Sequence, residues 1–258
     1  MSHIPISVFI ITLNEEKYLK QVLECLQNFD EIVLVDSGST DNTVEIAKQY
    51  GAKVYHQDWL GFAKQKSHAM SLCKNDWVLN IDGDEILGAE LADIIQSSVD
   101  EQRADAYRLY FEDVFWHMPM SANSKKRSIV RLYNKNKVQF PTDRLVHENV
   151  KLAKGAKEKD VAGLVTHHGY HSTEMLMEKQ NKYSSLKAQE KFNKGKKPSW
   201  LKLCLVFPLM FVKAYVIEGM FLSGRRGLVH AYISAMYGFL KEAKLHELHF
   251  IEKHKRNK

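Results

Sequence analysis

The sequence of 258 residues predicts an α/β fold, with a doubly wound sheet flanked by helices and a helical C-terminal region after it. In the first hundred residues, short runs of β-branched and other apolar residues alternate with segments whose apolar residues recur at helical spacing. Strands separated by helices pair in parallel through right-handed crossovers. After about residue 170 the strand pattern stops, and amphipathic or strongly apolar stretches follow.

The expected elements follow in order along the chain. In the first half we expect strands at 6–11, 31–35, 53–55 and 76–81, and helices at 15–28, 40–50 and 62–72. Short alternating strands are expected from 106 to about 166. A polar amphipathic helix at 172–194 then ends at Gly195-Lys-Lys-Pro198, a linker pattern, and a last helix is expected at 228–248.

Charge is distributed unevenly between the two halves of the chain. Residues 1–120 carry a net charge of −11 and residues 121–258 one of +17, which together make the net +6. An acidic front half fits a site that holds a cation, and a basic back half fits phosphates, anionic lipid or nucleic acid. Three scattered cysteines give neither a disulfide framework nor a zinc site, which indicates a reducing cytoplasm. The N-terminal apolar run lacks a basic segment before it, so we expect a strand there and no signal peptide.

An acidic cluster, Asp82-Gly83-Asp84-Glu85, directly follows the strand expected at 76–81. In an open parallel sheet, ligands bind at the carboxyl ends of the strands. Carboxylates so close together repel one another unless a cation neutralises them, and oxygen ligands favour Mg²⁺ or Mn²⁺. The alternative is a solvated turn or a helix N-terminus, where acidic residues are common.

Two other strands deliver polar residues to the same edge. The first ends in Thr12-Leu13-Asn14-Glu15, and the second in Asp36-Ser-Gly-Ser-Thr-Asp41. Asp36 could accept hydrogen bonds from a base or from ribose hydroxyls, and the small residues after it let a ligand approach the backbone. Alternatively, the segment 37–43 is a turn and a helix cap. Strands converging on one rim favour a binding site.

Four segments resemble glycosyltransferase family 2, of the GT-A fold: TLNEE, VDSGSTDNTVEIA, WLGFAKQK and WVLNIDGDE. These segments are most similar to those of bacterial lipopolysaccharide core glucosyltransferases. The resemblance continues through RLYNKNK, VHE, HHGYHS and the C-terminal GRRGL, although Phe115-Trp-His-Met-Pro119 departs from the Gly-Gly-Trp type of segment expected there. It implies a GT-A-like (Rossmann-like) mixed sheet flanked by helices, with a nucleotide-binding half at 1–100 and an acceptor half at 101–170.

The resemblance also implies roles for single residues in donor binding. Thr12, Asn14 and Glu15 would line the nucleoside pocket, with Asp36 on the base or ribose. Lys66 would read the pyrimidine ring. Asp82 would contact the ribose or a metal-bound water, and Asp84 would hold the divalent cation.

The catalytic base is expected in the acceptor half. An inverting transfer needs one carboxylate to take the proton from the acceptor hydroxyl. Glu148, in Val-His-Glu, matches the family, and Asp113 is the second candidate. Glu148 could instead be an exposed strand carboxylate paired with Lys151 or Arg144.

Two further side chains are candidates for the donor site. Arg131 could bind phosphate through two parallel hydrogen bonds or form a structural salt bridge. His167, in a Thr-His-His-Gly motif, would complete a metal site begun by Asp84. His168 is its rival, because neighbouring strand residues face opposite sides of a sheet.

The apolar stretch 200–222 indicates membrane association. Its longest uncharged segment, 203–212, is shorter than the ~20 residues that a spanning helix needs. Basic residues flank it, so it would lie in the headgroup region, as fits an enzyme with a lipid-linked saccharide acceptor. One alternative is a core helix packed on the catalytic domain. The other is nucleic-acid binding, and the acidic front half and the lack of a recognition motif disfavour this second alternative.

The sequence thus predicts a GT-A catalytic domain at 1–170 and a membrane-surface region at 171–258. The resemblance implies an inverting, metal-dependent transfer of a hexose, with glucose from UDP-glucose expected, to a lipopolysaccharide inner-core acceptor. The enzyme would be cytoplasmic and peripheral on the inner face of the inner membrane. Alternatives are another lipid-linked or capsular glycan as acceptor, or a non-catalytic nucleotide- or nucleic-acid-binding module.

Overall fold

A computed structural model describes residues 4–141 and 149–256. The chain forms two compact units, which are described separately. The unit that contains most of the expected catalytic domain, called the catalytic unit for that expectation, comprises Met1–Glu112 and Lys126–His168. The helical unit comprises Asp113–Lys125 and Gly169–Lys258. The last division between the units lies at 168/169, whereas the expected boundary was at residue 170, and the segment 113–125 is grouped with the helices. The assignment of the two regions to catalysis and to a membrane surface stays a prediction.

Nine strands form one mixed sheet over the described residues, in the order β3-β2-β1-β4-β8-β6-β11-β5, with β7 paired to β6. The first four are parallel to one another, and their bounds are Ile4–Thr12 (β1), Phe29–Asp36 (β2), Lys53–His56 (β3) and Trp77–Asn80 (β4). The helices that connect them are Glu16–Cys25 (α1), Thr43–Gln49 (α2) and Phe62–Ser71 (α3). Strands and helices alternate here as the sequence predicts.

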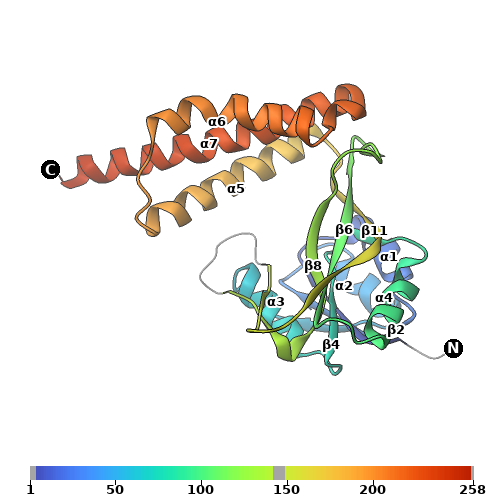
Figure 1. The fold of residues 1–258 in the computed structure, drawn as a ribbon. Helices are drawn as coiled ribbons and strands as arrows, with labels where there is room; N and C mark the ends of the chain where they lie inside the picture. Colours follow the sequence, from blue (N-terminus) through green and yellow to red (C-terminus); the bar gives the residue numbers. More distant parts are fainter. Residues whose placement is uncertain (1–3, 142–148, 257–258) are drawn as a thin grey trace. The chain divides into compact units, whose positions relative to one another are not determined.

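The other part of the sheet, which includes β6, β8 and β11 (Figure 1), contains antiparallel pairs of β8 with β4, of β8 with β6 and of β5 with β11. Its elements are Glu85–Leu87 (β5), Leu91–Asp100 (α4), Ala106–Phe115 (β6), Met118–Pro119 (β7), Arg127–Asn134 (β8) and Glu158–Tyr170 (β11). A 3₁₀ turn at Lys135–Lys137 leads to a small separate sheet of Val138–Gln139 (β9) and Lys151–Leu152 (β10). The sheet is therefore mixed rather than wholly parallel.

Strand β1 shows why the sheet is buried on both faces. Its residues Ile6, Val8 and Ile10 lie in one apolar cluster with residues of α1, whereas Phe9 lies in a second cluster with residues of α3. Successive strand side chains point to opposite faces, so an unbroken apolar run is buried when helices cover both. Burial on both faces thereby fixes the position of each strand in the sheet, and with it the position of the strand's carboxyl end.

The helical unit contains three long segments, labelled α5, α6 and α7 in Figure 1. Their bounds are Thr173–Asn193 (α5), Trp200–Val212 (α6) and Gly224–Arg256 (α7), and α6 continues as a π-helix over Lys213–Ile217 and a 3₁₀ turn over Met220–Ser223. Ser172 and Ser199 cap α5 and α6 by accepting hydrogen bonds from backbone amides. Helix α7 begins at Gly224, four residues before the start expected at 228, and extends past the end expected at 248.

Candidate active site

The carboxyl ends of the parallel strands bring the predicted donor residues to one edge of the sheet. Thr12 of β1 pairs in register with Asp36 of β2, and Phe9 of β1 with Asn80 of β4. The acidic cluster begins two residues after Asn80, so the three strand ends that the sequence singled out share one rim. Hydrogen bonds between their loops then fix the details.

Asp36 organises the turn that follows β2. One carboxylate oxygen accepts from the amides of Gly38 and Ser39, each at 2.9 Å. The other accepts from the Ser39 hydroxyl at 2.5 Å and from the Thr12 hydroxyl at 3.2 Å. A carboxylate offers about four acceptor positions, and these bonds occupy them. Direct binding of a base or ribose by Asp36 stays a prediction, and it requires Thr12 or Ser39 to release its bond.

The loop after β1 is held against the loop after β2. The Asn14 side-chain oxygen accepts from the Thr40 amide at 2.8 Å, and the Glu15 amide donates to the Thr43 hydroxyl at 2.8 Å. Asn14 has a φ of 57°, in the left-handed region that asparagine tolerates better than most residues. The predicted nucleoside residues Asn14 and Glu15 are thus positioned by the segment 37–43, which acts as a turn as well as a rim.

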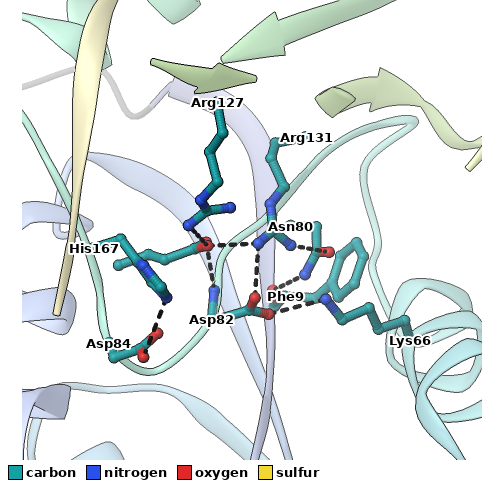
Figure 2. Close-up of polar contacts among 9 residues, drawn as sticks. Phe9, Lys66, Asn80, Asp82, Asp84, Arg127, Arg131 and His167 are labelled. Atoms are coloured by element: carbon teal, nitrogen blue, oxygen red, sulfur yellow. Dashed lines mark hydrogen bonds and ion pairs between the residues drawn. The ribbon is translucent and has the colours of Figure 1, made fainter. Parts of the chain in front are cut away.

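Asp82 is neutralised within the protein. Its two carboxylate oxygens contact the Lys66 ammonium at 2.9 Å and the Arg131 guanidinium at 2.7 Å, as Figure 2 shows. Burial raises the pKa of Asp82, but the charges of Arg131 and Lys66 outweigh it and hold this pKa well below its usual range. Asp82 is therefore an anion whose charge is already balanced.

Glu85 shares the same arginine. Its side chain is buried, and one oxygen lies 2.6 Å from the Arg131 guanidinium and 3.9 Å from that of Arg127. The other oxygen accepts from the Asp82 amide at 3.0 Å. Burial raises the pKa of Glu85 in spite of the attraction of Arg131. Both oxygens of Glu85 are consequently engaged, one by the Asp82 amide across the turn and one by Arg131, and neither is available to a ligand.

Arg131 is therefore committed to the protein itself. Besides Asp82 and Glu85, its guanidinium donates to the Asn80 side-chain oxygen at 2.7 Å. This geometry favours the salt bridge over the phosphate contact among the two interpretations that the sequence left open. Phosphate binding by Arg131 stays a prediction. Lys66, expected at the pyrimidine ring, has its ammonium on Asp82.

Asp84 is the member of the cluster that no lysine or arginine of the described residues balances. Among the described residues, the group within ion-pair distance of its carboxylate is the His167 imidazole, whose Nε2 lies 3.5 Å from Oδ2 (Figure 2). His167 pairs in register with Glu85, which aims its ring at the turn. His168 instead donates its amide to the Asp84 carbonyl at 2.9 Å and stacks its ring on Tyr18. Of the two histidines, the structure therefore places His167 beside the carboxylate.

One carboxylate oxygen and one imidazole nitrogen at this spacing could share a divalent cation. No group of three histidine, cysteine or acidic side chains suited to a metal occurs within residues 4–141 and 149–256. The pair therefore fits a cation whose other ligands come from diphosphate oxygens and water, which is how Mg²⁺ is commonly held.

Sequence reasoning missed two residues of this network. Arg127 lies with its guanidinium 4.3 Å from the centre of the Phe111 ring, facing Glu85, and Asn80 anchors Arg131. Arg127 and Arg131 are four residues apart on β8, so they share one face of the strand. Two arginines at this spacing on one strand, in a chain with three carboxylates at 82–85, could have predicted an ion-pair network between them.

The two candidate bases have different outcomes. Glu148 lies outside the described residues, so its role stays a prediction. Asp113 is in the helical unit, near the end of β6, and its carbonyl accepts from the Met120 amide at 3.0 Å. Its role as a base is likewise untested.

Comparison with known proteins agrees with this geometry. The family model for glycosyl transferase family 2 matches residues 7–153. An uncharacterized glycosyltransferase of Rickettsia typhi is 38% identical, over 94% of this chain and 87% of its own length. The lipopolysaccharide core biosynthesis glycosyltransferase LpsC of Rhizobium meliloti is 31% identical, over 96% of this chain and 94% of its own length. Among solved structures, S. aureus TarS matches 84% of this chain and 45% of its own, with a TM-score of 0.49 and 19% identity.

The mixed sheet flanked by helices agrees with the architecture that the resemblance implied. Both the family model and the relatives cover the strands that carry the acidic cluster. The chain belongs to glycosyl transferase family 2.

Proposed function

We propose that this protein is an inverting, metal-dependent hexosyltransferase that uses UDP-glucose and glycosylates a lipopolysaccharide inner-core acceptor at a membrane surface. The observation that carries the metal-dependent transfer is the division of charge in the acidic cluster. Asp82 and Glu85 are balanced by cations of the protein, whereas Asp84 faces only the His167 ring among the described residues.

That division supports distinct roles for the three carboxylates. Asp82 and Glu85, with Arg131 between them, hold the turn in one shape, so Asp84 is presented at a fixed position. Asp84 and His167 would bind the Mg²⁺ or Mn²⁺ ion. When bound, the ion neutralises negative charge that develops on the departing diphosphate.

The rim around Asp84 supports a nucleotide donor. Thr12, Asn14 and Glu15 follow β1, and the turn ordered by Asp36 follows β2, where a base and ribose would lie against backbone groups. Uracil as the base and glucose as the sugar rest on the family resemblance. Lys66 contributes a positive charge, which at present lies on Asp82.

The proposed transfer is a single displacement. The acceptor hydroxyl loses its proton to Glu148, attacks the anomeric carbon, and displaces the nucleoside diphosphate from the opposite side, which inverts the configuration and gives a β-linked product. Asp82 and Glu85, the other two carboxylates of the cluster, are engaged by Arg131, so neither is offered as a nucleophile for a double displacement.

The name of the LpsC relative and the helical unit support the acceptor and the location. LpsC is a lipopolysaccharide core biosynthesis glycosyltransferase. The segment Trp200–Ile217 has a mean hydropathy of 1.8, only 6% of it is buried within the protein, and its length and composition would suffice to cross a membrane. We place it at the inner face of the inner membrane, lying in the headgroup region as an amphipathic anchor, with the enzyme on the cytoplasmic side.

The rate of donor hydrolysis, compared between the parent protein and the Asp84→Ala variant, tests the proposal. With Mn²⁺ or Mg²⁺ present, the parent should hydrolyse UDP-glucose, and the variant should lose at least about 10²-fold, because the cation loses its protein carboxylate. Asp100→Ala, at an exposed carboxylate of α4, is the matched control and should keep full activity. A screen of UDP-sugars against extracted lipopolysaccharide then identifies the sugar and the acceptor.

The result also distinguishes the alternatives. A non-catalytic nucleotide-binding module would bind UDP and consume no donor under any metal. Equal activity of Asp84→Ala and the parent would refute the assignment of Asp84.

A further inference from the structure

A lysine-lined hollow in the helical unit is separate from the site described above. It has a volume of about 400 Å³ and lies among the end of α5, the linker to α6, the start of α6 and the middle of α7. Six of its lining residues are lysines and two are glutamates: Lys187, Lys191, Lys194, Lys196, Lys197, Lys202, Glu190 and Glu242. The lining therefore carries four more positive than negative charges.

The two glutamates are already engaged. Glu190 contacts the ammonium groups of Lys187 and Lys194, each at 2.9 Å, and the buried Glu242 pairs with Lys191. These ion pairs hold three of the lysines in place around the hollow. They leave the local charge strongly positive, because two carboxylates balance only two of the six ammonium groups.

The remaining lysines face no carboxylate in the described structure. Within residues 4–141 and 149–256, no acidic side chain lies within ion-pair distance of Lys196, Lys197 or Lys202. Lys241 shows the effect of this charge, because burial and the nearby positive charges, Lys191 foremost, lower the pKa of its ammonium. Like charges gathered around a hollow are a cost that a bound anion removes.

The position of the hollow indicates the source of the anion. Lys202 lies in the first turn of α6, directly after Trp200 and Leu201, which are 73% and 69% exposed. An exposed apolar helix end beside several lysines suits the boundary between acyl chains and headgroups, where apolar side chains insert and ammonium groups meet phosphates. A free anion in water would not account for the exposure of Trp200 and Leu201, because it makes no apolar contacts.

We infer that this hollow is a binding site for the phosphate of an anionic lipid headgroup, which anchors the helical unit at the membrane beside the exposed end of α6. The inference deepens the proposed membrane association and rests on it. It assigns lysines of the linker and of α6 to headgroup binding, with the lysines of α5 held around them by Glu190 and Glu242.

Vesicle binding by the full chain tests the inference. The triple variant Lys196→Gln/Lys197→Gln/Lys202→Gln should bind vesicles of phosphatidylcholine mixed with phosphatidylglycerol about 10²-fold more weakly than the parent. Binding to pure phosphatidylcholine should change little, because the apolar helix is intact. The matched control is Lys154→Gln/Lys157→Gln/Lys159→Gln, which removes the same charge from exposed lysines of the catalytic unit. The control should bind nearly as the parent does, and circular dichroism checks that both variants are folded.

The outcomes separate the explanations. Equal losses in the two triple variants would mean that only total charge matters, and would overturn the site. Calorimetric titration with inorganic phosphate is the second arm: tight binding that also releases the parent from vesicles would assign the hollow to free phosphate and overturn the lipid. If the parent binds neither kind of vesicle, the membrane association itself fails, independently of donor hydrolysis.

Discussion

The acidic rim of the catalytic unit and the lysine-lined hollow of the helical unit differ in how far their charges are balanced. At the rim, Arg131 and Lys66 balance Asp82 and Glu85, whereas Asp84, the proposed cation ligand, contacts the His167 imidazole. In the hollow, two glutamates hold three lysines in place while the total charge stays positive.

The difference matches what each region is proposed to bind. A catalytic cation needs a site of fixed geometry, so the surrounding charges are buried, hydrogen-bonded and matched one to one. A membrane surface is broad and fluid, so a surplus of charge beside an exposed apolar helix is sufficient. Substitutions should therefore act sharply in the first region and gradually in the second.

The largest expected effect is at the proposed base. Glu148→Gln keeps the shape of the side chain but cannot accept a proton, so turnover should fall by about 10²–10⁴-fold while UDP binding hardly changes. Single-turnover kinetics with UDP-glucose and acceptor would measure it, and nuclear magnetic resonance of the product would show a β linkage. Normal turnover in Glu148→Gln together with loss in Asp113→Asn would assign the base to Asp113, and an α-linked product would refute inversion.

The next largest effect is on stability. Arg131→Met removes the guanidinium from between Asp82 and Glu85, leaving Glu85 without its closest cation, and should lower the free energy of unfolding by about 3–5 kcal/mol. Urea denaturation measures it. Arg103→Met, at an exposed arginine 3.2 Å from Glu101, is the control and should cost less than about 1 kcal/mol. Similar values for both would mean that the buried network does not stabilise the turn.

A gradual effect is expected on the apolar face of α6. Leu201, Leu205 and Leu209 recur every four residues, and all are exposed. Leu209→Glu should weaken binding to phosphatidylcholine vesicles by about 10–100-fold, since one leucine can no longer insert. Leu164→Glu, on β11 of the catalytic unit, should leave vesicle binding unchanged. Parent protein that resists extraction by alkaline carbonate would show a spanning helix instead of a surface one.

The smallest effect concerns a carboxylate near the start of β2, at the opposite end of this strand from the rim. Glu31 accepts bonds from the Lys53 ammonium at 2.7 Å and the Ser7 hydroxyl at 2.6 Å. Burial raises the pKa of Glu31, but these bonds outweigh it and hold the pKa below the ordinary 4.5. Glu31→Gln should therefore cost about 1–2 kcal/mol at neutral pH.

The pH dependence follows from the sign of that shift. Because the folded-state pKa is the lower one, the ionised carboxylate stabilises the protein above about pH 4.5, and this stabilisation is lost as pH falls through the folded-state value. The difference between Glu31→Gln and the parent in urea denaturation should thus shrink in acid. A difference that is constant with pH would show that the charge of Glu31 does not matter.

The sequence was sufficient for the features that depend on local pattern. Apolar runs and helical spacing predicted the parallel strands. The ends of these runs predicted which side chains would share a rim, because the carboxyl ends of parallel strands meet at one edge of a sheet. The His167 ring lies beside Asp84, and the choice between His167 and His168 needed the pairing of β11 with β5. The role of His167 as a metal ligand stays a prediction.

Other features depend on partners that are distant along the chain. The saturation of Asp36 by Thr12 and Ser39, and of Asp82 by Lys66 and Arg131, cannot be deduced from spacing, since it requires loops and strands to meet in three dimensions. Likewise, Pro208 reads as a helix breaker, yet α6 passes through it and continues as a π-helix.

The segment 113–125 belongs with helices that are made much later in the chain. Phe115 and Met120 pack with Leu176 and Ile233, and the Arg226 guanidinium donates to the Phe115 carbonyl at 3.1 Å. On a ribosome, the roughly 110 residues between position 115 and position 226 take about 5–20 seconds to synthesise. The apolar side chains of this hairpin are therefore without their covering helices throughout that interval, and a gene cut at residue 170 would leave them so permanently.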